Sequence, residues 1–237
     1  MQAWAKTAAI AAAVSLIGGV AWKYTHPGPE SNPIRAENDT NVTVLPFSSL
    51  TSIDDLPLGW EHEQFWMVHP MQVAFTERDG KPVARCETNS NGSILRRYTD
   101  IEVGDYPVLS WDWLIEFPIS SNADETTEQG DDHPARLLIV LEDRQGGAYP
   151  FEIIWSNAKF EPGDYLVING FAHYVANGLD ENTKVWQHQE VNLMQIYRDI
   201  TGRDDYPLLK SIGIMCDSDN TATRSIAYFS DVEMKVR

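Results

Sequence analysis

The sequence is poor in basic residues. Its 237 residues hold 18 lysines and arginines against 35 aspartates and glutamates, which gives a formal net charge of −17. Charges of the two signs cancel over residues 1–45, so the whole acidic excess lies in the rest of the chain. A surface of this sign repels phosphate backbones, and we therefore expect no nucleic-acid partner. It suits a saline environment or an acidic face that docks on a partner.

Residues that would mark zinc or acyl-transfer chemistry are few and scattered. No serine or cysteine stands in a nucleophile motif such as Gly-x-Ser-x-Gly. The histidines of the folded part show no zinc-ligand spacing; they are His62, His69, His133, His173 and His188. We also find no internal repeat, which excludes solenoid architectures.

Cysteine is nearly absent, with only Cys86 and Cys216, each inside a strand-like segment. In an exported protein two such residues can pair as a disulfide. Two separate buried thiols are the alternative, and the geometry that decides between them cannot be taken from spacing alone.

One long apolar run is present, over residues 7–22, with Lys6 in front of it. A basic residue before an alanine-rich run is typical of a signal peptide, and Gly19-Val20-Ala21 fits a cleavage site. A helix over residues 3–24 would rise roughly 30 Å and cross a bilayer. We predict an uncleaved membrane anchor over residues 1–24, with a cleaved signal peptide as the alternative. Either way, we expect the rest to lie on the periplasmic side of the inner membrane.

Two further segments follow this run. Residues 25–45 are rich in proline, glycine, asparagine and serine, which predicts a flexible linker. Residues 46–237 contain many short strand-like runs, and in one of them Leu109, Trp111 and Trp113 alternate onto one face. We predict one exported domain over residues 46–237, built as an all-β, jelly-roll-type sandwich.

One late α-helix interrupts the strands. Leu193, Ile196, Tyr197 and Ile200 fall at helical spacing, and Gly202 stands where a C-cap glycine belongs. The Asp79-Gly80 pair, between two strand-like runs, predicts a tight hairpin.

Several blocks, taken together, resemble a family of exported bacterial proteins, the domain-of-unknown-function group numbered 3047. The blocks are Gly59-Trp60, Trp111-x-Trp113, Gly130 to Arg136, Asp217 to Thr221, and Ala227 to Asp231. The resemblance covers roughly residues 45–237. It implies a sandwich similar to galactose-binding domains and carbohydrate-binding modules, without an established activity.

The block Asp131-Asp132-His133 has the residue types of a general acid/base site, because paired carboxylates split their pKa values. Arg136 follows closely and can hold a carboxylate in a bidentate pair, or bind a ligand. The alternative is a loop tied down by an aspartate–arginine pair and a proline turn, and we favour it.

Oxygen ligands suited to calcium lie near the end of the chain: Asp217, Asp219, Asn220 and Asp231. The spacing lacks the glycine and the distal glutamate of a calcium loop. Turn chemistry, in which Asp217 and Asn220 bond their own backbone, explains the same residues. A structural calcium ion is the only cofactor that we expect.

Tryptophans are the remaining indication of a ligand. Trp111 and Trp113 share the apolar face of a strand and are expected in the core, whereas Trp66 and Trp186 have polar residues nearby in the sequence. Exposed aromatic rings bind the faces of sugars. We therefore predict Trp66, Trp186 and Arg136 as binding residues.

These observations favour a non-catalytic, membrane-tethered binding module in the periplasm. Its partner is either a glycan or a larger membrane protein complex, to which it is docked as an accessory subunit. The alternative is a glycan hydrolase or lyase that uses Asp131, Asp132 and His133.

Overall fold

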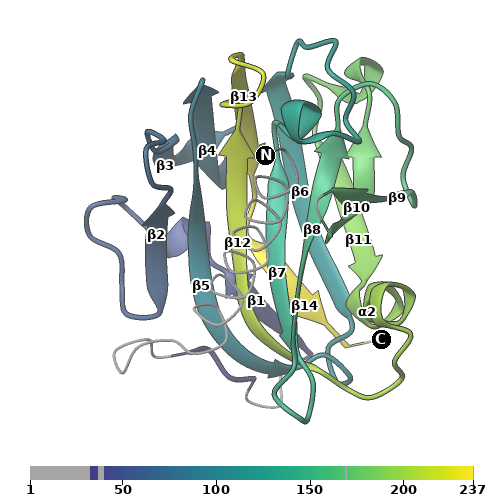
Figure 1. The fold of residues 1–237 in the computed structure, drawn as a ribbon. Helices are drawn as coiled ribbons and strands as arrows, with labels where there is room; N and C mark the ends of the chain where they lie inside the picture. Colours follow the sequence, from purple (N-terminus) through teal and green to yellow (C-terminus); the bar gives the residue numbers. More distant parts are fainter. Residues whose placement is uncertain (1–32, 37–39, 169, 237) are drawn as a thin grey trace.

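The computed structural model describes residues 33–36, 40–168 and 170–236. Over these residues the protein is a two-sheet β-sandwich with one short α-helix (Figure 1), which confirms the predicted all-β class. The anchor predicted over residues 1–24 lies outside the described residues. Within the described part, no helix is long and apolar enough to cross a membrane.

Each sheet has seven strands, and we name the sheets I and II. Sheet I has the strand order β1-β14-β6-β13-β4-β3, and β11 pairs with β6 in addition. Its strands are β1 (Asn41–Leu45), β3 (Gln72–Arg78), β4 (Lys81–Asn89), β6 (Val108–Phe117), β11 (Gln187–Asn192), β13 (Arg224–Phe229) and β14 (Val232–Lys235). Sheet II has the order β2-β5-β12-β7-β8-β10-β9; its strands are β2 (Trp60–Gln64), β5 (Gly92–Glu102), β7 (Arg136–Glu142), β8 (Ala148–Ser156), β9 (Tyr165–Ile168), β10 (Phe171–Gly178) and β12 (Leu208–Asp217). Among the described strands, β8 and β10 pair in parallel and all other pairs are antiparallel.

The main core lies between the sheets and is filled by alternate residues of each strand. In β6, Trp111 and Trp113 point inward as predicted and are buried. Trp113 meets Trp155 of sheet II with ring centroids 5.7 Å apart. Edge-to-face pairs of this kind add about 0.5–1.5 kcal/mol beyond the area that they bury.

The face of sheet II that is turned away from sheet I is also apolar in its middle. Leu138 and Val140 point to this outer face, and their neighbours Leu137, Ile139 and Leu141 fill the main core. The strand β7 is therefore buried on both faces. An antiparallel sheet with one solvated face normally alternates apolar with polar residues, and the apolar residues in the middle of this outer face are accordingly buried.

The helix α2 (Leu193–Thr201) occupies the predicted place. The side chain of Asn192 caps its first turn by accepting from the Gln195 N–H, and Gly202 ends it with φ 69°. The Asp79-Gly80 hairpin between β3 and β4 also forms as predicted, with both residues at positive φ. Single-turn 3₁₀ helices lie at Phe47–Ser49, Glu128–Gly130 and Asp180–Asn182.

The folded domain begins before residue 46, which corrects the linker predicted over residues 25–45. Residues 41–45 form β1, which pairs with β14, and Ile34 bridges Thr99 of β5. The short run from Asn41 to Leu45 does alternate, with Val42 and Val44 buried. The polar composition around it masks this pattern.

A disulfide joins Cys86 of β4 to Cys216 of β12, with the Cα atoms 6.5 Å apart. Both residues are fully buried between the sheets. The bond therefore links sheet I to sheet II through the centre of the core.

Candidate functional site

Two of the sequence blocks, Gly130 to Arg136 and Asp217 to Thr221, meet at one end of sheet II. Arg136 opens β7 and Asp217 closes β12, and the antiparallel register of these strands brings the two residues together. The Arg136 guanidinium is buried, and its Nη2 lies 2.8 and 3.0 Å from the two carboxylate oxygens of Asp217. The carboxylate of Asp132 accepts from the backbone N–H of Thr221 at 2.6 Å and of Asn220 at 3.3 Å. The two loops are thus fixed to each other by charge-assisted hydrogen bonds.

Three further groups surround Arg136 on the outer face of sheet II. Its Nη1 lies 2.6 Å from the Glu152 carboxylate and 3.2 Å from that of Asp131. His173 Nε2 lies 3.2 Å from Glu152 and 3.4 Å from Asp131. Glu152 and His173 are buried, whereas the side chain of Asp131 is 24% exposed. We call Asp131, Arg136, Glu152, His173 and Asp217 the ionic cluster.

Sequence reasoning identified Asp131, Arg136 and Asp217 but missed Glu152 and His173. A sign of Glu152 was present, because it is the one charged residue in the apolar run over residues 150–155. His173 gives no such sign, because its neighbours are an ordinary strand sequence. Its position beside Glu152 depends on the parallel pairing of β10 with β8.

His133 lies next to the ionic cluster and is fully buried. Its Nδ1 is 3.1 Å from the backbone oxygen of Trp155, and its backbone N–H donates to Asp217 at 3.2 Å. Among the described residues, its Nε2 has no hydrogen-bond partner, and the Asp131 carboxylate lies 3.7 Å away. Burial, with Arg136 nearby, lowers the pKa of His133 well below its ordinary value, so this ring is neutral.

The other groups of the cluster have widely separated pKa values. Burial alone would lower the pKa of His173, but its bonds to Asp131 and Glu152 outweigh burial and raise the pKa to about 9. Burial alone would raise the pKa of Glu152, but Arg136 and His173 outweigh it and lower the pKa to about 2. Burial raises the pKa of Asp217 well above its ordinary value. At neutral pH, His173 is therefore a cation and Glu152 an anion.

The raised pKa of His173 predicts a loss of stability at alkaline pH. A group that binds its proton more tightly in the folded state stabilises the fold fully below its unfolded pKa of 6.5, and this stabilisation disappears as the pH rises through about 9. We expect His173 to contribute about 3 kcal/mol below pH 6.5 and little above pH 9. Urea unfolding of the wild type and of His173→Gln across this range measures the contribution. A difference between the two proteins that stays constant from pH 6.5 to 9 would contradict it.

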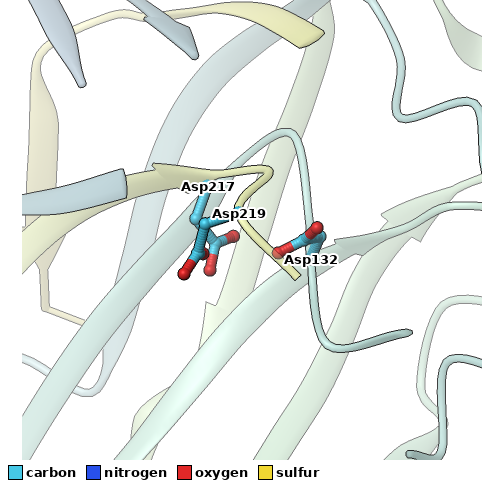
Figure 2. A group of neighbouring side chains, drawn as sticks. All are labelled: Asp132, Asp217 and Asp219. Carbon is cyan, nitrogen blue, oxygen red and sulfur yellow. The ribbon is translucent and has the colours of Figure 1, made fainter. Parts of the chain in front are cut away.

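Three carboxylates at this end of sheet II could hold a hard cation such as Ca²⁺. Asp132, Asp217 and Asp219 each offer one oxygen, and these oxygens lie within 4.8 Å of one another. Figure 2 shows the Asp132 carboxylate across from those of Asp217 and Asp219. Burial and the nearby Asp132 carboxylate raise the pKa of Asp219. Calcium binding by this group stays a prediction.

Two of the predicted calcium ligands lie differently from expectation. The side-chain amide of Asn220 donates to the backbone oxygen of Glu128 at 2.5 Å. Asp231 lies in the turn between β13 and β14, where its carboxylate accepts from the Ser48 N–H at 2.8 Å. Asp231 therefore does not join Asp217 and Asp219, and Asp132 takes its place in the group.

The predicted binding residues Trp66, Trp186 and Arg136 do not form one surface. Trp66 follows β2 and is 89% exposed, next to Phe65, which packs on the outer face of sheet II. Trp186 lies on the outer face of sheet I, where its indole N–H donates to Asp79 at 3.0 Å. Arg136 is enclosed by the ionic cluster.

The comparisons with known proteins identify the family. A family model described as "Protein of unknown function (DUF3047)" matches residues 58–233. The chain belongs to this family. No curated protein matches the sequence. The DUF3047 match includes both blocks that meet at Arg136, and it begins after the predicted linker.

Several solved structures are similar to this chain at low sequence identity. One is a carbohydrate-binding module of family 28, specific for non-crystalline cellulose, with 14% identity, a TM-score of 0.40, and coverage of 85% of this chain and 98% of that one. Another is a variant of a family 29 carbohydrate-binding module complexed with cellulohexaose, with 9% identity, a TM-score of 0.34, and coverage of 82% and 89%. An exo-beta-agarase has 8% identity and a TM-score of 0.42; the match covers 82% of this chain but only 25% of that one.

Proposed function

We propose that this DUF3047 domain binds a neutral glycan, without catalysis, on the outer face of sheet II. The observation that carries the proposal is Trp66, whose side chain is 89% exposed at the border of an apolar sheet face. A tryptophan costs solvation free energy when it stands in water, and it stacks well on the C–H face of a sugar ring. The family resemblance to carbohydrate-binding sandwiches points the same way.

The outer face of sheet II supplies the other parts of such a site. Its middle is a buried apolar cluster of Leu138, Val140 and Met215, against which the partly buried Phe65 and Phe171 pack. Asp131 borders this apolar area and keeps a partly exposed carboxylate that can accept hydrogen bonds from hydroxyl groups. An apolar surface with a few convergent polar groups is the usual composition of a ligand site. The negative charge of Asp131 favours a neutral sugar over an acidic one.

A glycan hydrolase would need two free carboxyl groups on either side of the scissile bond. The Asp132 carboxylate already accepts hydrogen bonds from Asn220 and Thr221, and Asp131 is paired with Arg136. We therefore propose a structural role for this block. If Asp131→Asn abolished the turnover of a glycan without lowering the melting temperature, the hydrolase alternative would hold instead.

Replacing Trp66 by alanine tests the binding proposal. We expect the variant to lose at least tenfold in affinity for the neutral oligosaccharide that the wild type binds best, because the stacking surface is gone. Isothermal titration after a screen of neutral oligosaccharides measures this. Tyr206→Ala is the matched control, since Tyr206 is an exposed aromatic residue, at 56%, outside sheet II. Equal affinities of Trp66→Ala and the wild type would refute the proposal.

A protein partner is the second candidate, and one observation favours it. Met67, beside Trp66, is 82% exposed, and methionine together with tryptophan is enriched in protein interfaces. A membrane protein complex that retains the wild type and releases Trp66→Ala, together with no glycan binding, would support this candidate over the first.

We also propose that the domain works outside the cytoplasm, tethered to the inner membrane through residues 3–24. The Cys86–Cys216 disulfide supports export, because such bonds persist in oxidising compartments. The apolar run that follows Lys6 supports the tether.

A further inference from the structure

We propose that the outer face of sheet I holds a second binding site, specific for the carboxylate of an acidic sugar. The site is a hollow of about 360 Å³ lined by Arg78, Glu116, Phe117, Pro118 and Lys184. It lies on the sheet opposite to the neutral-glycan surface, so it stands independently of that proposal.

The charges around the hollow favour an anion. Arg78 Nη1 lies 2.9 Å from the Glu116 carboxylate, which also accepts from the Tyr228 hydroxyl at 2.6 Å. Arg78 is thus balanced by Glu116 of the lining, and its Nε also lies 3.8 Å from the Asp79 carboxylate. Among the described residues, no carboxylate lies within ion-pair distance of the Lys184 ammonium group, which is exposed. Lys184 is therefore the one cation of the lining whose charge no carboxylate balances among the described residues, in a protein whose net charge is −17.

The lining also offers a surface for a sugar ring. Phe117 ends β6 and is 46% exposed, and Pro118 continues the apolar surface. The guanidinium carbon of Arg224 lies 5.0 Å from the centroid of the Phe117 ring, which holds that ring in place. An aromatic ring beside two cations suits a ligand that has an apolar face and a carboxylate on the same ring.

The loop that carries Lys184 is conformationally strained. Leu179 has φ 68° and ψ 151°, and Lys184 has φ 64°. Neither residue is a glycine, and each such conformation costs of order 1–3 kcal/mol. A bond from the Lys184 N–H to the Ile115 oxygen, 2.7 Å long, fixes the lysine above the end of β6. Strain of this kind is retained where a side chain must be placed precisely.

The experiment compares three probes by isothermal titration at low salt: trigalacturonate, neutral maltotriose and inorganic phosphate. We expect trigalacturonate to bind best, with an affinity that falls as salt is added. Lys184→Gln should weaken its binding at least tenfold. Lys159→Gln, at an exposed lysine in a distant loop, and Trp66→Ala should leave it unchanged.

Three results of the titrations would overturn this proposal. They are no measurable binding of trigalacturonate, equal binding of maltotriose or phosphate, and unchanged affinity in Lys184→Gln. Amide shifts of Phe117 and Lys184 in the wild type locate the bound probe, and shifts confined to sheet II would also refute the site. Failure of the neutral-glycan proposal would show only in the affinity of Trp66→Ala for neutral oligosaccharides. The two proposals are therefore judged by separate measurements.

Discussion

Replacing Arg136 by methionine is expected to destabilise the domain by about 3–5 kcal/mol at pH 7. The substitution removes the one guanidinium that contacts Asp131, Glu152 and Asp217. Glu152 and Asp217 then remain buried without their main partner, and a buried charge that has lost its counter-charge is far more costly than an exposed one. Urea unfolding of the wild type and of the variant measures the change.

Arg144→Met is the matched control. Arg144 pairs with Glu102 at the surface, where its side chain is 51% exposed, so its loss should cost less than about 1 kcal/mol. If Arg136→Met proves too unstable to fold, Arg136→Lys can be measured instead. It keeps the charge but not the bidentate contact, and it should lower the free energy of unfolding by a smaller amount. A loss below about 1 kcal/mol in Arg136→Met would show that the ionic cluster does not hold the two loops together.

Removing the disulfide is expected to cost about 5 kcal/mol. Cys86 and Cys216 are 130 residues apart in the chain, so their bond removes a large amount of conformational entropy from the unfolded state. The double variant Cys86→Ala, Cys216→Ala should therefore unfold at a much lower urea concentration than the oxidised wild type.

Reduction of the wild type supplies the comparison. The reduced wild type and the double variant should have similar stabilities, because both lack the constraint on the unfolded chain. Since both cysteines are fully buried, the reductant must be added to the unfolded protein before refolding. A change of less than about 1 kcal/mol on reduction would mean that the bond adds nothing to the stability of the two-sheet core.

The fold was largely predictable because local patterns agree with it. Alternation in β6 places Trp111 and Trp113 in the core, and Gly202 ends the helix where expected. The strand β1 was missed because it is short and follows a polar stretch. The parallel pairing of β10 with β8 could not be predicted, because nothing in either strand specifies its neighbour.

The site was predictable in its residue types but not in its arrangement. Both acidic blocks are visible in the sequence, yet the contact between Asp132 and Thr221 depends on how β12 pairs with β7. The same chemistry placed Asp231 in the predicted calcium group, although the structure holds it against Ser48. Long-range strand register therefore decided which carboxylates meet.

The two tryptophans show the same limit. Trp66 and Trp186 both have polar residues nearby in the sequence, and only the structure separates the two. Trp186 packs on the apolar cluster of sheet I that includes Val83 and Leu114, so it supports that face, whereas Trp66 stays exposed.

The central claim is that the outer face of sheet II is the ligand-binding surface. Nuclear magnetic resonance of the indole of Trp66 and the methyl group of Met215, during titration with the best neutral oligosaccharide, tests it most directly. We predict saturable shifts of both groups, with those of sheet I residues such as Trp186 unchanged. Saturable binding that leaves Trp66 and Met215 unshifted, or no binding by the folded protein across the whole panel, would contradict the claim.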